Sequence, residues 1–469
     1  MVINAEPKRV FEIFSLISEI PRGSGNTDKI SEFCVNFAER NGLWCFRDGL
    51  NNVIIKKPGS KGRESAEPVI LQGHLDMVCE KTADSDIDFK RDGLKLRLGG
   101  DLLSAEGTTL GADDGIAVAV IMALLEDKTA IHPPVEAVFT TDEETGMFGA
   151  QGLDTSRLSG KRLINLDSGE EGVLTVGCAG GAKVHLRFPV SRTANADPCF
   201  KITVSGLKGG HSGIDINKGR QNADKLAAEL LAEMPFNFAL VSIGGGFKDN
   251  VIPCACECVL AADNDPTDYV NRFCKEHLTD TDDGLKITVC KTEMSAECLS
   301  GDSSQKIIGF LNAVPSGVTA LSRSIPGLVE SSQNLGIVST DEEGVTAVVS
   351  VRSSIAKEKH GLLRGIANLA EKYGAEMSVH GDYPAWEYRE NSPLVGVMTA
   401  VFEKKYGRKP TVETVHAGLE CGLLSEKIKG FDAVSLGPDM WDIHTVGERP
   451  SVSSTKRTYE YLREVLKEL

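Results

Sequence analysis

Apolar residues recur at helical spacing at the start of the chain. The pattern predicts two amphipathic helices over residues 7–20 and 27–40. Two short apolar runs follow at 44–46 and 53–55, and the turn-forming pair at 48–49 between them indicates a β-hairpin. The chain is therefore expected to begin with helices that precede an antiparallel pair of strands.

Three later segments are largely apolar and have the length of strands. They lie at 69–71, 135–140 and 163–166, and an apolar helix over 115–125 separates the first two. Strands with so few polar positions are typical of a parallel sheet that is buried on both faces by helices. The sequence therefore predicts a helix-covered, mostly parallel sheet.

The pattern changes at Ala182, where apolar and polar residues begin to alternate, as in a sheet with one face buried. Helix and strand alternation resumes after Pro384. We therefore expect an α/β domain in two parts, 1–181 and 383–469, interrupted by an inserted α+β domain over 182–382. The elements expected in the insert are strands 201–204 and 251–260, helices 220–234 and 267–277, and a hairpin over 336–351; those expected after it are helices 393–402, 419–428 and 454–466 and strands 411–415 and 433–436.

Composition and charge exclude several classes of protein. The 469 residues include 51 Lys and Arg against 67 Asp and Glu, a net charge of −16 that disfavours nucleic acid as a partner. The longest apolar run, 116–125, is too short to cross a membrane. Residues 1–17 carry Glu6, Lys8, Arg9 and Glu12 among their apolar residues and so lack the unbroken apolar centre of a secretory signal. Twelve cysteines spread over a large chain favour reduced thiols. We expect a cytoplasmic protein.

Acidic residues and a histidine come directly after three of the predicted strands. The carboxyl ends of parallel strands line the ligand crevice of an open α/β sheet, so residues far apart in sequence can converge there. Each motif alone is also typical of a loop salt bridge or a solvated acidic turn, and only together do they indicate a site. The residues are His74, Asp76, Glu143, Glu144 and Asp167, and Asp113 begins the apolar helix.

Such a group of carboxylates predicts a metal centre. Without a cation the carboxylates would repel one another and raise one another's pKa, whereas divalent ions between them remove that cost. Imidazole and carboxylate ligands without a Cys-x-x-Cys pair favour zinc or a similar transition metal in an open catalytic site. One carboxylate could bridge two ions.

Six short segments resemble the MH-clan co-catalytic zinc exopeptidases, and within that clan the dipeptidases that cleave aminoacyl-histidine peptides. The resemblance runs over the whole chain, and the last two segments point to the dipeptidase branch. The segments are GHLD at 73–76, GADDG at 111–115, DEETG at 142–146, NLDSG at 165–169, HAGLECG at 416–422 and DMWDIH at 439–444.

The resemblance implies the ligands of two zinc ions per subunit, for which manganese or cobalt can substitute. Asp113 is implied to bridge the two ions. His74 and Asp167 complete one coordination sphere, and Glu144 and His444 complete the other. The residue pattern alone does not make these assignments.

The resemblance also makes Glu143 the general base, whereas spacing alone does not order Glu143 and Glu144. It likewise selects His444, although both His416 and His444 follow predicted strands and either could reach the crevice.

Asp76 lies two residues from His74, a spacing that on an extended segment lets its carboxylate orient the ligating imidazole.

Two further residues, His416 and Glu420, are expected either to shape the substrate pocket or to support a strand-to-helix turn, and neither is assigned to catalysis.

Three residues of the predicted insert resemble positions of the clan's lid domain. His211, in GGHSG at 209–213, is implied to contribute to binding the oxygen of the tetrahedral intermediate. Asn250 and Arg352 are implied to contact the substrate end, and an Arg fork suits a terminal carboxylate. The resemblance further suggests a homodimer through the lid, and leaves open whether His211 acts in its own subunit or in a partner.

The function implied is that of a di-zinc dipeptidase. Two ions sharing a water lower its pKa towards ~7, which makes hydroxide available for attack on the peptide carbonyl while Glu143 takes the proton. The substrates implied are unblocked dipeptides, including Xaa-His such as carnosine. A tripeptidase and an N-acyl amino acid deacylase share the ligands, but segment 416–422 argues against them. A non-catalytic metal-binding scaffold is expected to lack a metal ligand or the general base. This sequence has a suitable residue at each of these positions.

Overall fold

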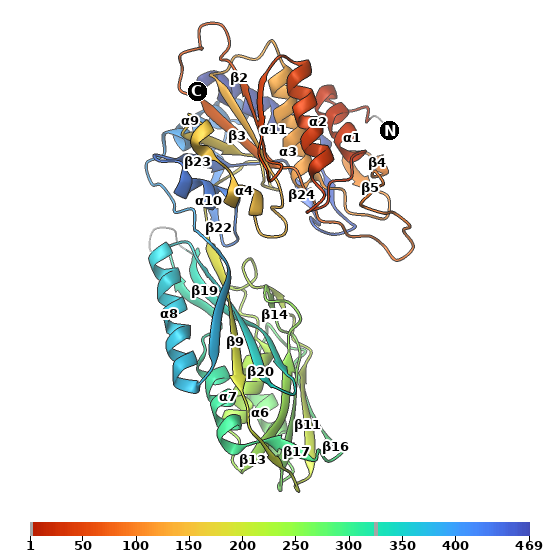
Figure 1. Ribbon diagram of the computed structural model, residues 1–469, viewed down its shortest axis with the longest axis vertical. Helices are drawn as coiled ribbons and strands as arrows, with labels where there is room; N and C mark the ends of the chain where they lie inside the picture. The colour runs from red at the N-terminus through yellow and green to blue at the C-terminus, as the bar shows by residue number, and fades with distance from the viewer. Residues whose placement is uncertain (1–2, 323–326) are drawn as a thin grey trace. The chain divides into compact units, whose positions relative to one another are not determined.

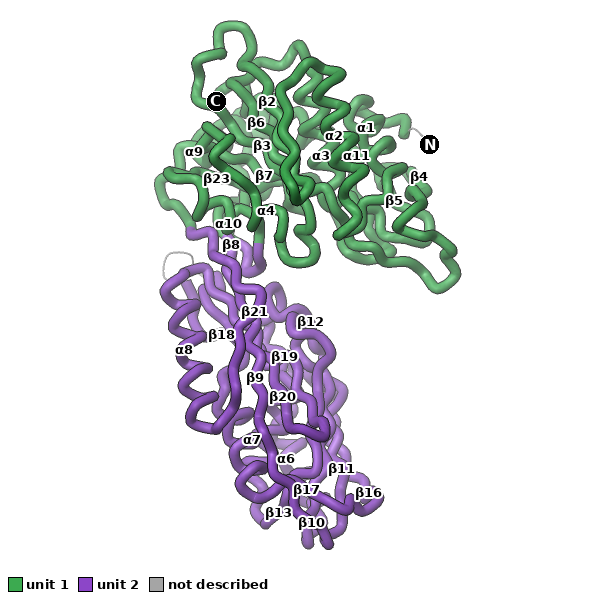
Figure 2. The backbone as a smooth tube through the Cα atoms, in the orientation of Figure 1, with its two compact units in different colours: residues 1–177, 388–414, 419–469 green, residues 178–387, 415–418 purple. Residues whose placement is uncertain are grey.

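The computed structural model describes residues 3–322 and 327–469. The chain forms two compact units (Figure 2). The first comprises Met1–Gly177, Tyr388–Thr414 and Leu419–Leu469, and the second comprises Cys178–Glu387 and Val415–Gly418. The second unit is thus inserted into the sequence of the first. Among the described residues, no helix has both the length and the apolar character needed to cross a membrane.

An eight-stranded sheet forms the centre of the first unit (Figure 1). Its inner strands β6, β3, β7 and β23 are parallel to one another. On either side of these four strands, β2 pairs antiparallel with β6 and β8 pairs antiparallel with β23, and the hairpin β1–β2 forms one edge. This confirms the predicted mostly parallel sheet. In spatial order the strands are β1 (Trp44–Arg47), β2 (Val53–Lys57), β6 (Val135–Thr140), β3 (Val69–His74), β7 (Arg162–Asn165), β23 (Asp432–Ser435), β8 (Val173–Cys178) and β22 (Thr411–Val415).

Helices cover this sheet, and its inner strands β3, β6 and β23 are therefore buried along their whole length. Helix α3 is almost entirely buried, which explains why it is apolar on all sides rather than on one. It shares one hydrophobic core with α1, α2, α9 and α11, while α10 packs against α4. The bounds are α1 (Lys8–Ser18), α2 (Asp28–Arg40), α3 (Ala112–Glu126), α4 (Phe148–Gly152), α9 (Pro393–Tyr406), α10 (Glu420–Lys427) and α11 (Val452–Glu468).

The second unit contains a nine-stranded antiparallel sheet, with helices that share its core. Its main strand order is β16-β11-β15-β13-β19-β20-β9-β21, with β18 paired to β19. The strands are β9 (Gly180–Pro189), β11 (Cys199–Ser205), β13 (Phe238–Gly245), β15 (Cys256–Ala262), β16 (Lys286–Thr292), β18 (Gly317–Leu321), β19 (Val329–Thr340), β20 (Gly344–Ser353) and β21 (Glu376–Tyr383); the helices are α5 (Ala223–Ala232), α6 (Thr267–Glu276), α7 (Gly301–Ala313) and α8 (Ala356–Tyr373).

Short strands and one 3-10 helix complete the described chain. Four two-stranded sheets lie outside the two large ones. They are β4 (Leu96–Gly99) with β5 (Leu102–Ala105), β10 (Arg192–Ala194) with β17 (Glu297–Leu299), β12 (Gly210–His211) with β14 (Val251–Ile252), and β24 (Met440–Trp441) with β25 (Arg449–Pro450); the 3-10 helix η1 spans Thr155–Arg157.

The prediction of one continuous strand over 251–260 is wrong. The structure divides this segment into β14 and β15, which belong to different sheets. Pro253 lies between them and has no backbone N–H to donate to a ladder, so the strand is interrupted there.

Candidate metal centre

The predicted metal-site residues of the first unit lie at the carboxyl end of its parallel strands. His74 is the last residue of β3, and Asp167 follows β7 by two residues. Glu144 lies in the turn after β6. Asp113 lies in the first turn of α3, and His444 lies in the loop between β24 and β25. Elements far apart in the sequence therefore bring these side chains together.

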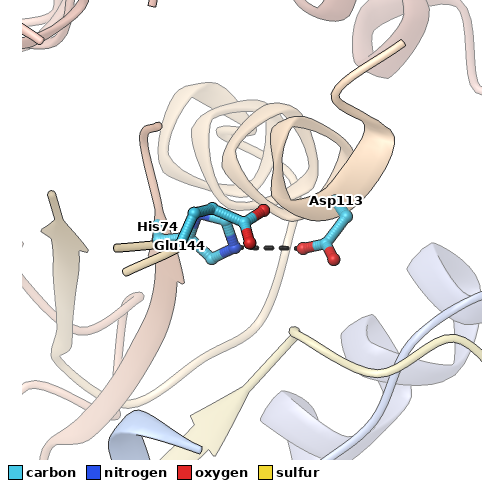
Figure 3. Close-up of side chains that lie close together, drawn as sticks. All are labelled: His74, Asp113 and Glu144. Carbon is cyan, nitrogen blue, oxygen red and sulfur yellow. Dashed lines mark hydrogen bonds and ion pairs between the residues drawn. The ribbon is translucent and has the colours of Figure 1, made fainter. Parts of the chain in front are cut away.

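The Asp113 carboxylate lies between two imidazoles. Its Oδ1 is 3.0 Å from Nε2 of His74, and its Oδ2 is 3.2 Å from Nε2 of His444. The same nitrogen of His444 is 3.0 Å from Oε2 of Glu144. Figure 3 shows His74, Asp113 and Glu144 facing one another at the end of β3 and the start of α3. One histidine on each oxygen is the arrangement expected of a carboxylate shared by two ions.

Potential ligand atoms form two overlapping groups. His74, Asp113 and Glu144 offer atoms within 4.8 Å of one another, and so do His74, Asp114 and Asp167. Asp114 was not predicted as part of the site. It is buried, and its Oδ2 accepts a hydrogen bond from the backbone N–H of His74 at 3.1 Å. No signal in the sequence distinguishes Asp114 from Asp113.

The residues present fit a pair of divalent cations. Oε1 of Glu144 is buried and has no hydrogen-bond partner among the described residues. Burial, together with the charges of Asp113 and Asp114, raises the pKa of Asp167 well above its usual value. Burial also opposes ionisation of Asp113, but hydrogen bonds from His444 and His74 hold the pKa of that carboxyl well below its usual range. Bound cations would satisfy the orphaned oxygen and compensate the crowded carboxylates.

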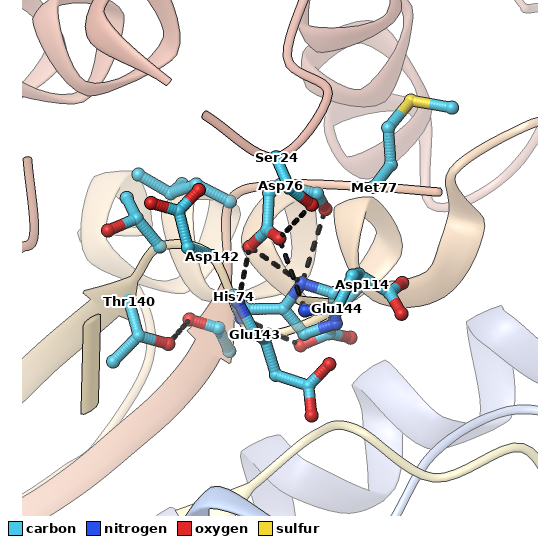
Figure 4. Close-up of polar contacts among 12 residues, drawn as sticks. Ser24, His74, Asp76, Met77, Asp114, Thr140, Asp142, Glu143 and Glu144 are labelled. Atoms are coloured by element: carbon cyan, nitrogen blue, oxygen red, sulfur yellow. Dashed lines mark hydrogen bonds and ion pairs between the residues drawn. The ribbon is translucent and has the colours of Figure 1, made fainter. Parts of the chain in front are cut away.

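Asp76 connects the histidine to the acidic turn (Figure 4). Nδ1 of His74 is 3.2 Å from the backbone carbonyl oxygen of Asp76 and 3.5 Å from its Oδ1. The two carboxylate oxygens of Asp76 also accept hydrogen bonds from the backbone N–H groups of Glu143 at 3.1 Å and Glu144 at 3.3 Å, and from Oγ of Ser24 at 2.8 Å. Asp76 therefore contacts the imidazole through its backbone and its carboxylate, and the carboxylate also binds the backbone of both glutamates.

Glu143 differs from Glu144 in its surroundings. Glu143 belongs to neither group of potential ligands. Burial is the main cause that raises its pKa to about 8, and the charges of Glu420 and Glu144 act in the same direction against that of His74. A carboxyl group with a pKa near neutral pH, next to both groups of potential ligand atoms, is suited to hold and release a proton.

Comparison with known proteins identifies the family. The model of peptidase family M20/M25/M40 matches residues 70–468. The chain belongs to this family. It is accordingly a peptidase, and the match confirms the resemblance drawn from its six motifs.

Two relatives resemble this M20/M25/M40 peptidase over almost its full length. The cytosol non-specific dipeptidase of Escherichia coli (strain K12) is 34% identical over 474 residues, which cover 99% of this chain and 98% of that protein. The crystal structure of aminoacylhistidine dipeptidase from Vibrio alginolyticus has a TM-score of 0.91 at 33% identity, and covers 100% of this chain and 98% of that one. Aminopeptidase PepT from Bacillus cereus, with a TM-score of 0.59 at 18% identity, shares the fold.

The remaining predicted site residues of this peptidase, His211, Asn250 and Arg352, belong to the second unit. Nδ1 of His211 accepts hydrogen bonds from the backbone N–H groups of Gly213 and Ile214, both at 3.1 Å, so its proton lies on Nε2. The carbonyl oxygen of Asn250 accepts a hydrogen bond from the backbone N–H of Ser212 at 2.9 Å, next to His211 in the chain.

His416 lies near these residues within the second unit. Burial, and then the positive charge of Arg352, lower the pKa of His416 to about 4, so its imidazole is neutral at neutral pH. Its Nε2 is 2.7 Å from Oγ of Ser332. Arg352 donates to the hydroxyl of Tyr383 at 3.0 Å. The second unit therefore gathers one guanidinium and two imidazoles, a set of cationic and donor groups.

Glu420 makes contacts within the first unit that the spacing of the motifs could not predict. Its Oε2 accepts hydrogen bonds from Nε2 of Gln72 and Oγ1 of Thr140, both at 2.6 Å. Burial raises its pKa to about 7. It thus joins α10 to the carboxyl ends of β3 and β6.

Proposed function

We propose that this protein hydrolyses the peptide bond of unblocked dipeptides, including Xaa-His dipeptides such as carnosine, at a centre that holds two zinc ions. The observation that carries the proposal is the Asp113 carboxylate, which has His74 against one oxygen and His444 against the other. The full-length similarity to proteins named cytosol non-specific dipeptidase and aminoacylhistidine dipeptidase supports the choice of substrate.

Five side chains would hold the ions. Asp113 would bridge them, with His74 and Asp167 on one side and Glu144 and His444 on the other. When bound, the pair of cations lowers the pKa of a water molecule and polarises the scissile carbonyl. Manganese or cobalt could occupy the same donors, since imidazole and carboxylate also suit those metals.

Glu143 moves the proton in this scheme. Its carboxylate accepts a proton from the attacking water and gives it to the nitrogen of the departing amine, so the carboxylate is regenerated at the end of each turnover. The hydrogen bond from the Glu143 backbone to Asp76 holds the turn in place while this happens.

Residues of the second unit would recognise the substrate. The Nε2–H of His211 is oriented as a donor by the two backbone amides on Nδ1, and so suits the oxyanion that develops on the carbonyl. The guanidinium of Arg352 would pair with the terminal carboxylate, and Asn250 would add a contact at the same end. The free amine would lie against the acidic metal centre.

We also propose a cytoplasmic homodimer that forms through the second unit. Twelve cysteines spread over a large chain, together with the name of the cytosol dipeptidase from Escherichia coli, support the compartment. Light scattering on the purified protein tests the dimer.

A substrate panel tests the proposed activity. We expect zinc-loaded protein to cleave carnosine and Leu-Gly with a kcat/KM about 10- to 100-fold higher than for Leu-Gly-Gly or N-acetyl-leucine. The tripeptide misplaces its terminal carboxylate, and the acetyl group blocks the amine. Preference for the tripeptide would indicate a tripeptidase, and preference for the acetylated amino acid would indicate a deacylase. Zinc binding without any turnover would indicate a metal-binding scaffold.

A further inference from the structure

The Glu448 carboxylate accepts four hydrogen bonds, all from one short stretch of backbone. Glu448 is buried, and its Oε2 accepts hydrogen bonds from the N–H groups of Leu110 at 2.7 Å and Gly111 at 2.8 Å. Its Oε1 accepts from Ala112 at 2.7 Å and Asp113 at 3.2 Å. A carboxylate has about four lone-pair sites, so this side chain is saturated by four consecutive amides.

Glu448 also lies close to the second histidine of the site. It follows His444 by four residues, at the end of a tight loop. Two backbone hydrogen bonds close that loop, from Thr445 N–H to the Asp442 carbonyl and from Glu448 N–H to the Thr445 carbonyl, both at 3.1 Å. One side chain therefore ties the loop that carries His444 to the backbone that carries Asp113.

Arg22 also binds this stretch of backbone, through a carbonyl group. Its buried guanidinium donates from Nη1 to the carbonyls of Leu75 at 2.8 Å and Asp76 at 3.0 Å, and from Nη2 to the carbonyl of Gly111. Gly111 has a φ of 64°, and a Cβ there would lie 2.5 Å from Nη2 of Arg22. Only glycine fits this approach, so the loop after His74 and the start of α3 are fixed to each other.

These contacts are charge-assisted and buried, which makes them strong and specific in geometry. The four amides lie at and just before the N-terminal end of α3, where the backbone of Asp113 departs from helical geometry. Within the part of the chain that the structure describes, the Glu448 side chain binds backbone amides and no side chain of a potential ligand. Any effect of Glu448 on the metal centre therefore passes through the backbone of Asp113 and the loop that carries His444.

We propose that Glu448, together with Arg22, is a positioning residue for metal binding: it fixes the Asp113 carboxylate against His444, and so preorganises the bridge between the two ions. This inference rests on the proposed two-metal centre. Without Glu448, the Leu110–Asp113 backbone would have to find other partners, and the ions would have to order it on binding. The cost would appear as weaker zinc affinity.

The test compares two Glu→Gln variants of buried, amide-binding carboxylates. Glu448→Gln keeps the volume of the side chain but turns an amide NH₂ towards backbone donors. Glu136→Gln is the matched control, because Glu136 is buried and accepts backbone hydrogen bonds from Ser159 and Gly160 at the opposite end of β6. Zinc affinity of the chelator-stripped proteins is measured by competition with a chromophoric chelator, and the midpoint of thermal unfolding by circular dichroism.

We expect Glu448→Gln to weaken zinc binding roughly 10- to 100-fold, whereas Glu136→Gln leaves it within about twofold of wild type, even where both lower the unfolding midpoint. Wild-type zinc affinity in folded Glu448→Gln would overturn the proposal. Where that variant does not fold, Glu448→Asp and Arg22→Lys replace it, and unchanged affinity in both would overturn the proposal equally.

Turnover is recorded separately. Wild-type protein that binds zinc but cleaves no dipeptide would contradict the proposed function, while the affinity comparison would still decide the role of Glu448.

Discussion

Glu143→Gln is expected to lower kcat for dipeptides by about 10²- to 10⁴-fold. Glutamine is similar in size but cannot accept a proton from water or pass one to the departing amine. Zinc binding should persist, because Glu143 is not one of the five side chains proposed to hold the ions. Steady-state hydrolysis of Leu-Gly and metal analysis of the same preparation measure the two effects.

The neighbouring carboxylates supply the controls for this variant. Asp142 lies in the same turn, and its Oδ1 accepts a hydrogen bond from the backbone N–H of Gly25 at 2.6 Å. Asp142→Asn should retain kcat within a few-fold. Glu144→Gln should lose zinc as well as turnover, since Glu144 contacts His444. A Glu143→Gln protein with near wild-type kcat, or one that has lost its zinc, would contradict the assigned role.

Asp113→Ala is expected to abolish the centre as a whole. The substitution removes the carboxylate that contacts both His74 and His444, so neither ion retains its shared ligand. Bound zinc should fall from two ions per chain to less than one, and kcat/KM should fall by at least about 10³-fold, because the cations contribute several kcal/mol to stabilisation of the transition state. Metal analysis after gel filtration measures the first effect, and dipeptide hydrolysis measures the second.

Asp282→Ala provides a control for the removal of a buried aspartate. Asp282 is buried in the second unit and accepts hydrogen bonds from the backbone N–H groups of Lys208 at 2.8 Å and Gln221 at 2.7 Å. This variant should unfold at a lower temperature yet bind zinc with wild-type stoichiometry. Full zinc occupancy in Asp113→Ala would show that another carboxylate, such as Asp114, bridges the ions.

The fold class could be predicted from the segments in which burial produces a clear pattern of apolar residues. The inner strands of the first unit are buried on both faces, so they appear as apolar runs, and the structure confirms the mostly parallel sheet that these runs predict. Helices α7 and α8 were not predicted. Helix α8 places Leu362, Ile366 and Ala370 in the core of the second unit, but it also contains Gly361 and Gly365, and glycine has a low helix propensity.

The candidate site was predictable as a region but not in its finer assignments. Strand ends placed the acidic residues and His74 at one edge of the sheet. Choosing between His416 and His444 required the family resemblance. In the structure, His444 contacts Asp113 and Glu144, whereas His416 contacts Ser332 in the second unit.

Other features of the site depend on contacts that no local pattern encodes. Glu448 binds amides that precede it by more than 300 residues in the chain. The hydrogen bond from the backbone of His74 to Asp114 likewise depends on the approach of two separate elements. Such contacts emerge from the tertiary structure, so motif spacing could not predict them.

A zinc titration of the metal-free protein tests the two-metal dipeptidase most directly. Protein stripped by a chelator is titrated with zinc while hydrolysis of Leu-Gly and carnosine is followed. We predict no turnover without metal, recovery that reaches a plateau at two zinc ions per chain, and no recovery in Asp113→Ala. Full turnover in zinc-free protein, or two bound zinc ions without hydrolysis of either dipeptide, would contradict the proposed function.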